Sequence, residues 1–289
     1  MASLPALKDV IPLMPEVVGA MGRFIEQRIH GGAAFQRDDA FVAAQSERLD
    51  RWLAWLRPEV RGLEHLPTRG PYLCVGNHSG GLYTPCMWAF LSRWYAHLGV
   101  ETPAYFLGLD MALALPGVGS IYRRMGAVPA SAANAAAVFA RAAPLLVYPG
   151  GDHEAFRPWR DRGKIDFGGR KGFVALALEH GVPVIPVTAA GSHETTFVLA
   201  RGDRLAASMG LEQLRVKVFP FTLGFPFGLA PGFVPQLPFP SKITLEVGEP
   251  LDWHRRYGPE DAAKPEVVAR CYGEITDLMQ ATLDRLRGT

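Results

Sequence analysis

The sequence predicts an α/β fold in which a mainly parallel sheet is flanked by helices, with an N-terminal helical extension. Short apolar runs typical of buried strands alternate with stretches of helical periodicity between about residues 72 and 187. Two of these runs end in glycine-rich segments with polar side chains, which is where open α/β sheets place their chemistry. The alternation favours parallel strands joined by crossover helices.

Two amphipathic helices are expected before the sheet. Apolar residues recur at intervals of three and four at about 15–29 and again at about 39–56. Both helices are expected to dock on the core, with the alternative that the first one lies on a lipid surface. The chain is therefore divided into N-terminal helices at 1–57 and an α/β domain at 58–289.

The elements of the α/β domain follow in order. A short strand at 60–63 is expected to form a hairpin or strand pair with the run at 72–76. The run at 182–187 contains two prolines, which indicate an edge strand or a strand end. Further strands are expected at 104–107, 145–148 and 242–247, and helices at 85–97, 131–143, 170–181 and 267–282.

The stretch from Phe219 to Phe239 has an unusual composition. It contains no charged residue, six phenylalanines and five prolines. This proline spacing excludes a regular helix and a long central strand, so we expect an irregular apolar loop. The loop either covers the core or forms a membrane-contacting patch or acyl-chain wall.

Bulk properties exclude several classes of protein. The net charge of +2 and pI near 8.5 do not indicate a nucleic-acid binder. The three cysteines form no close pair, which argues against disulfides or zinc and for a reducing compartment. No apolar run reaches the ~18 residues of a spanning helix. A secretory leader is not expected, because charges and prolines interrupt the N-terminal segment at Lys8, Asp9, Pro12 and Pro15. We expect a cytoplasmic, peripherally membrane-associated protein.

The first polar segment at a strand end is Asn77-His78-Ser79-Gly80-Gly81. His78 would lie on an elbow between a strand and a helix, close to backbone N–H groups that the glycines leave accessible. A neutral imidazole near pH 7 can act as a general base. A single histidine is more often structural, so the interpretation depends on the neighbouring segments.

The second such segment contains Gly150, Gly151, Asp152 and Glu154. If its strand neighbours the first one, the two elbows form one pocket. Three consecutive metal-binding residue types at 152–154 seldom converge on one ion, so we expect no metal site. Turn formation and substrate hydrogen bonding explain these residues better.

Basic residues follow the second elbow. Between Arg157 and Lys171 there are six Lys or Arg against two Asp, enough to neutralise a phosphorylated ligand. The alternative is a solvated charged loop. Arg123 and Arg124 form a smaller basic pair.

Together, these segments resemble the glycerolipid acyltransferase family, which is related to the lysophosphatidate acyltransferases, and they are closer to its diacylglycerol-acyltransferase-like branch. The resemblance implies transfer of a fatty acyl group from a thioester co-substrate, acyl-CoA or acyl carrier protein, to a lipid hydroxyl, without a cofactor. His78 would remove the hydroxyl proton. The resemblance spans 60–252, and its most specific parts are 77–81, 148–151 with Glu154, 171–173 and 182–187.

The sequence departs from the family pattern at the acid that partners the histidine. The expected aspartate position holds Tyr83 or, in branches with the Ser-Gly-Gly extension, Cys86. We expect Asp152, Glu154 or Asp110 to replace it from another loop. The alternatives are a weakened or non-catalytic lipid-binding relative, and a secondary or engineered change at Cys86.

Two further interpretations follow from these departures. Cys86 near a helix N-terminus should have a lowered thiol pKa, and with His78 it could serve a thioesterase or hydrolase. The second motif lacks the family's usual acceptor-phosphate residues, with Glu154 and Arg157 as the nearest candidates. This favours a less charged lipid alcohol as the acceptor.

Overall fold

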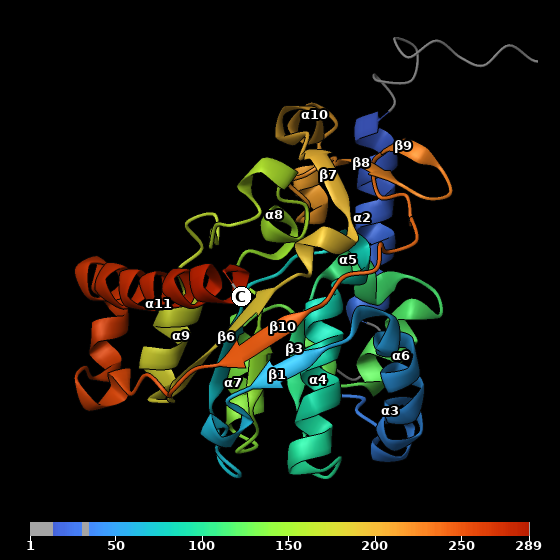
Figure 1. The fold of residues 1–289 in the computed structure, drawn as a ribbon. Coiled ribbons are helices and arrows are strands. Elements are labelled where there is room, and N and C mark those ends of the chain that lie inside the picture. The colour runs from blue at the N-terminus through green and yellow to red at the C-terminus, as the bar shows by residue number, and fades with distance from the viewer. Residues whose placement is uncertain (1–13, 31–34, 289) are drawn as a thin grey trace, which may run out of the picture.

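The computed structural model describes residues 14–30 and 35–288 and contains a seven-stranded sheet with helices on both faces (Figure 1). Lys8, Asp9 and Pro12, on which the expectation about a leader partly rests, lie outside these ranges. The sheet has the order β1-β10-β6-β2-β5-β3-β4. Its strands are β1 (Glu59–Arg61), β2 (Leu73–Gly76), β3 (Tyr105–Gly108), β4 (Ala127–Pro129), β5 (Leu145–Val147), β6 (Val184–Ala190) and β10 (Thr244–Val247).

The five strands from β6 to β4 are parallel, and β10 runs antiparallel to β6. This confirms the predicted mainly parallel sheet with flanking helices and an N-terminal helix. Because β2 and β5 are neighbours, their carboxyl ends meet at one edge of the sheet. The helices are α2 (Met14–His30), α3 (Asp39–Leu53), α4 (Pro85–Leu98), α5 (Asp110–Ala114), α6 (Val118–Arg124), α7 (Ala132–Phe139), α8 (Gly151–Ala155), α9 (Gly172–His180), α10 (Asp203–Ser208) and α11 (Pro265–Arg287).

The proline-containing strand β6 is internal, so its prediction as an edge strand is wrong. It pairs with β2 on one side and β10 on the other, and all of its residues are buried. Pro183 precedes the strand. Pro186 lies just beyond the point where the β10 ladder ends at Val247, and its carbonyl accepts the N–H of Gly248. The missing proline N–H therefore falls where the ladder is already ending.

The predicted pairing of the first two strands is also wrong. β1 runs parallel to β10, with Val60 opposite Leu245. The strands β10 and β6 lie between β1 and β2. β1 is three residues long and only partly buried, which is typical of a short edge strand.

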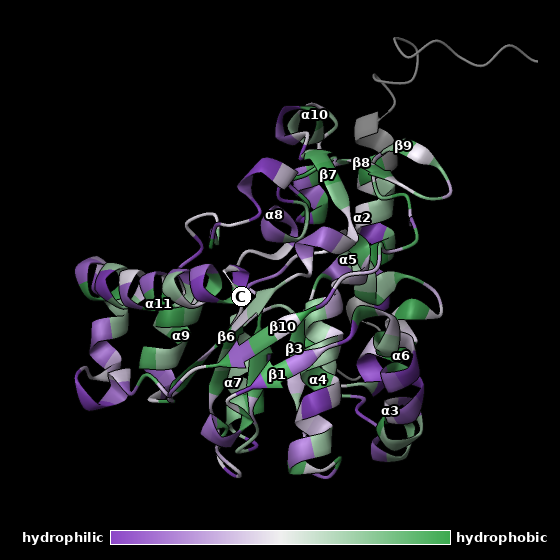
Figure 2. Cartoon of the chain, in the orientation of Figure 1, coloured by the Kyte–Doolittle hydropathy of each residue, from purple (hydrophilic) through white to green (hydrophobic). Residues whose placement is uncertain are grey.

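Two hydrophobic layers enclose the sheet. Alternate β2 residues point to opposite faces: Cys74 packs with Phe90 and Trp94 of α4, whereas Leu73 and Val75 pack in the layer formed by α7, α9 and α11. Figure 2 shows the hydrophobic strands inside and hydrophilic residues along α11 outside. The central strands are therefore buried on both faces, as a parallel sheet requires.

A smaller antiparallel sheet lies above the carboxyl edge, with β7 (Phe197–Ala200), β8 (Phe221–Gly224) and β9 (Gly228–Pro231) (Figure 1). The predicted irregular apolar loop is thus partly a hairpin. Pro226 lies in its turn and Pro231 ends β9, so neither interrupts a strand. The helices α2, α5 and α10 share a small core that contains Val18 and Ile25. Within 14–30 and 35–288, no helix is long and apolar enough to cross a bilayer.

Candidate active site

His78 lies two residues beyond the end of β2, on a turn that is fixed to the sheet by Asn77. The Asn77 side chain donates to the carbonyl of Ala189 (2.9 Å) and accepts the N–H of the same residue (2.7 Å). These two bonds imitate a strand pair with β6 and extend the sheet past Gly76. The backbone that carries His78 is therefore held by buried hydrogen bonds.

The imidazole of His78 has a thiol on one side and an aromatic ring on another. The Sγ atom of Cys86 lies 3.7 Å from Nδ1, and the Tyr148 ring lies 4.3 Å from the imidazole, centroid to centroid, at 32°. Burial lowers the pKa of His78 to about 3, so the partly exposed ring is neutral at physiological pH. Tyr148 belongs to the 148–151 motif and follows β5 directly, but its contact with the imidazole was not predicted from the sequence.

Cys86 is fully buried at the start of α4. Its thiol lies 3.8 Å from the carbonyl oxygen of Ser79, to which it donates. The expected fall in the pKa of Cys86 is wrong, because burial raises it. Pro85 is the first residue of α4 as predicted, whereas Thr84 has a left-handed conformation and provides no side-chain cap. The short distance to His78 identifies Cys86, rather than Tyr83, as the residue at the expected acid position.

Among the described residues, no carboxylate is hydrogen-bonded to the imidazole. Asp110 pairs with Arg215 (2.9 Å), and Asp152 pairs with Arg170 (2.7 Å). Glu154 accepts the backbone N–H of His78 (3.1 Å), which is not the ring. The prediction that one of these acids replaces the missing aspartate is therefore not met.

Glu154 instead holds the backbone of the elbow through its hydrogen bond with the His78 N–H. It is 0% exposed, and its carboxylate forms an ion pair with Arg157, itself 3% exposed. Burial raises the pKa of Glu154 to about 7, while the Arg157 charge lowers it. Arg157 also donates to the carbonyl of Lys164. A substrate phosphate at Arg157, as the sequence suggested, would have to displace this buried carboxylate.

The two glycine turns differ in their free hydrogen-bond donors. The N–H of Gly151 already donates to the Tyr148 carbonyl (3.0 Å). In the part of the chain that the structure describes, no acceptor takes the N–H of Gly80 or Gly81. Gly80 has a φ of +89°, and an added Cβ would lie 2.9 Å from the Ser192 carbonyl oxygen, so glycine is required there. The first turn is therefore the better source of backbone donors.

Most of the predicted phosphate-binding cations are already paired. Arg124 pairs with Asp38 (2.7 Å) and lies over the Phe41 ring. Lys171 is exposed beside Tyr272, with no ion pair among the described residues. The remaining basic residues of the run, Arg160, Arg162, Lys164 and Arg170, each contact an Asp or Glu.

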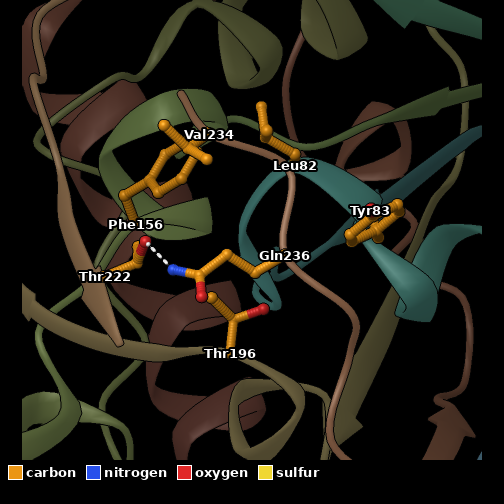
Figure 3. Close-up of a pocket in the computed structure, with 7 residues that line it drawn as sticks. All are labelled: Leu82, Tyr83, Phe156, Thr196, Thr222, Val234 and Gln236. Atoms are coloured by element: carbon orange, nitrogen blue, oxygen red, sulfur yellow. Dashed lines mark hydrogen bonds between the residues drawn. The ribbon is translucent and has the colours of Figure 1, made fainter. Parts of the chain in front are cut away.

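A small pocket is lined by uncharged side chains, among them Leu82 and Tyr83, which follow the His78 turn in the sequence (Figure 3). In it, the Gln236 amide donates to the Thr222 hydroxyl (2.9 Å). Sequence reasoning missed Gln236, since nothing in the local pattern connects it with a turn that lies more than 150 positions earlier. The pocket is lined by Leu82, Tyr83, Phe156, Thr196, Thr222, Val234 and Gln236.

Comparisons with known proteins agree with this geometry. A family model described as Acyltransferase matches residues 57–190. An uncharacterized protein of Mycobacterium tuberculosis is 32% identical over 282 residues, which covers 94% of this chain and 75% of that protein. Phytyl ester synthase 2, chloroplastic, of Arabidopsis thaliana is 32% identical over 242 residues, covering 79% of this chain and 34% of that protein.

A solved structure shares the fold. The crystal structure of the 1-acyl-sn-glycerophosphate (LPA) acyltransferase, PlsC, from Thermotoga maritima superposes with a TM-score of 0.55 at 17% identity, covering 97% of this chain and 96% of that one. The likeness extends over nearly all of both chains. The sequence matches over the domain that carries the His78 elbow show that the chain belongs to the glycerolipid acyltransferase family and is an acyltransferase.

Proposed function

We propose that this acyltransferase moves a fatty acyl group from a thioester, acyl-CoA or acyl carrier protein, to the hydroxyl of an uncharged lipid alcohol, with His78 as the general base. The observation that carries the proposal is the contact between Nδ1 of His78 and Sγ of Cys86. With Nδ1–H donating to the sulfur and the thiol donating to the Ser79 carbonyl, the free nitrogen Nε2 keeps its lone pair. The neutral thiol thus selects the tautomer that a base needs.

The reaction proceeds through a tetrahedral intermediate. As the alcohol oxygen attacks the thioester carbonyl, Nε2 of His78 takes the hydroxyl proton. The carbon–sulfur bond then breaks, and the leaving thiolate takes that proton from the imidazolium, so the base is regenerated. The N–H groups of Gly80 and Gly81 would stabilise the negative oxygen. A thiol cannot stabilise the imidazolium as a carboxylate does, so we propose a modest rate.

Cys86 is assigned here a positioning role. Its side chain is fully buried and its thiol pKa is raised, so at neutral pH it is neither accessible nor ionised as a nucleophile must be. These properties argue against the thioesterase alternative. Glu154 acts on the same elbow through the backbone N–H of His78.

The proposed acceptor class follows from the charges around the site. Arg157 and Arg170, two cations of the basic run that follows the second elbow, are neutralised by internal carboxylates. The relative named phytyl ester synthase 2 forms, by its name, phytyl esters, and a phytyl group carries no phosphate, which supports the same class.

A panel of acceptors tests the proposal. With acyl-CoA donors, we expect product from long-chain alcohols and diacylglycerol to exceed product from lysophosphatidate by at least about tenfold, because Arg157 and Arg170 are already paired with internal carboxylates. Mass spectrometry of the products measures this ratio. A preference for lysophosphatidate would contradict the acceptor assignment, and product from no acceptor would favour a lipid-binding relative without activity.

We further propose peripheral membrane contact through the Phe219 to Phe239 segment, together with α2, on the cytoplasmic side. At the hairpin turn, Phe225 is 64% and Phe227 61% exposed, an arrangement that water disfavours and a bilayer interface accommodates. Leu223, Leu229 and Leu237 are exposed nearby. The family's lipid acceptors are themselves membrane molecules.

Serine at both Phe225 and Phe227 should weaken binding to phosphatidylcholine vesicles by about a hundredfold or more, because each change removes ~2 kcal/mol of apolar burial. Co-sedimentation measures the bound fraction. Leu278→Ser, on the exposed side of α11, is the matched control and should leave binding unchanged. Undiminished binding of the double variant would show that the hairpin does not contact the membrane.

A further inference from the structure

The side chain of Tyr148 reaches the His78 imidazole across a position that has no side chain. The strands β2 and β5 run parallel with Val75 opposite Val147, so Gly76 and Tyr148 are the next residues along the two strands. A Cβ atom added to Gly76 would lie 2.4 Å from Cε1 of the Tyr148 ring. The ring therefore fills the space beside the Gly76 backbone, and a side chain at position 76 would require it to move.

The backbone beyond Gly76 places His78 next to the same ring. The two hydrogen bonds of the Asn77 side chain with Ala189 continue the strand pairing past Gly76. The ring centroids of His78 and Tyr148 lie 4.3 Å apart, with 32° between the ring planes. Two rings this close and this nearly parallel must face each other. One face of the imidazole therefore lies against the π face of the tyrosine.

The hydroxyl group of Tyr148 does not account for its place beside His78. The Oη atom is buried and has no hydrogen-bond partner among the described residues. Burial raises the pKa of Tyr148, so the phenol stays protonated. A buried hydroxyl without a partner lowers stability. What Tyr148 contributes to the site therefore comes from its ring.

The imidazole becomes a cation when it takes the proton of the acceptor alcohol. Cys86 contacts Nδ1 as a neutral thiol, and Glu154 accepts the backbone N–H of His78 instead of a ring proton. The face of an aromatic ring carries partial negative charge and attracts a cation within about 6 Å of its centroid. The Tyr148 ring lies well inside this distance.

We propose that the Tyr148 ring stabilises the imidazolium of His78 during acyl transfer and holds the imidazole in its orientation, and so takes over part of the task of the missing aspartate. Tyr148 is then a positioning residue, and Gly76 provides the space that its ring needs. The inference rests on the proposed role of His78 as the general base.

Aromatic analogues at position 148 separate the charge attraction from packing. Tyr148→Phe should keep kcat within about twofold, because the ring remains and only an unpartnered hydroxyl is lost. Pentafluorophenylalanine in place of Tyr148 retains an aromatic ring but makes its face partially positive. It should lower kcat about tenfold relative to Tyr148→Phe and leave KM for the acceptor within about twofold, because the imidazolium forms only during the reaction.

A second variant displaces the ring without changing it. Gly76→Ala should lower kcat by about tenfold, as Tyr148→Leu should, because the added methyl group pushes the ring away from the imidazole. In the double variant the two losses should not add, since both act through one ring. Tyr105→Leu is the matched control, because Tyr105 is also partly buried but lies at the opposite end of the neighbouring strand β3. Its kcat should not change.

Two kinds of result would overturn the role of Tyr148. Equal kcat for the phenylalanine and pentafluorophenylalanine proteins would show that the face of the ring does not stabilise charge. Additive losses from Gly76→Ala and Tyr148→Leu, or an equal loss from Tyr105→Leu, would show an effect of stability alone. If His78→Ala lost activity while every Tyr148 variant kept it, only the role of Tyr148 would fall. If His78→Ala kept its activity, the general base and this inference would fall together.

Discussion

His78→Ala should lower the rate of acyl transfer by about 10²- to 10⁴-fold, the range that a general base contributes. An alcohol remains a poor nucleophile until its proton is removed, and no other described side chain combines a free ring nitrogen with the glycine turn. The measurement is initial product formation by mass spectrometry at saturating acyl-CoA. The thermal unfolding midpoint should change little, because the partly exposed imidazole makes only the weak contact with Cys86 and the ring contact with Tyr148 among the described residues.

His97→Ala provides the matched control, since His97 is exposed near the end of α4. Its activity should equal that of the wild type.

In the wild type, the lowered pKa of His78 predicts no loss of rate between pH 8 and pH 5 from titration of the base, because the ring stays neutral above about pH 3. If His78→Ala kept more than a tenth of the activity, His78 would not be the general base.

Arg157→Met should destabilise the protein by about 3–5 kcal/mol, the cost of leaving a buried charge without its partner. Glu154 is fully buried, so no solvent can replace the guanidinium. The loss of the pair also loosens the residue that accepts the His78 N–H, so activity should fall with stability. Denaturant unfolding followed by circular dichroism measures the change.

The effect should grow with pH. Burial already raises the folded-state pKa of Glu154 to about 7, above its value in the unfolded chain. A raised carboxyl pKa means that stability is lost as pH rises from the unfolded to the folded value. Without Arg157 the folded value rises further, so above about pH 7 the variant keeps losing stability while the wild type does not.

Arg160→Met is the control for this comparison, because the Arg160 side chain is 85% exposed and its pair with Asp161 lies at the surface. Its unfolding free energy should change by less than about 0.5 kcal/mol at every pH. A similar free energy for Arg157→Met and Arg160→Met would show that Glu154 is solvated or protonated without its partner.

Local patterns predicted the fold class and the place of the elbow. Alternating apolar runs and helical periods identified the parallel strands, and β2 and β5 proved to be neighbours. The order of the outer strands was not predictable in this way. Whether β1 pairs with β2 or β10 depends on contacts between segments nearly 200 residues apart, which no local pattern encodes.

The hydrogen-bond partners and pKa values of the site residues were harder to predict than which residues belong to the site. The motif identified Glu154 as important, but a carboxylate at the end of the neighbouring strand can face either the ring of His78 or its backbone, and here it accepts the backbone N–H. Burial determines the direction of the pKa shift of Cys86. A position at a helix N-terminus should lower the thiol pKa, but the loss of solvent raises it by more. Both outcomes depend on packing in three dimensions.

The paired hydrogen bonds between the Asn77 side chain and Ala189 have a consequence for motion in the enzyme. They make the turn before His78 part of the same cooperative unit as the buried strand β6, so the turn cannot open unless the centre of the sheet opens too. The base is thus rigid before any substrate arrives. Whatever movement admits two long-chain substrates has to come from the hairpin and α2, the same elements proposed to touch the bilayer.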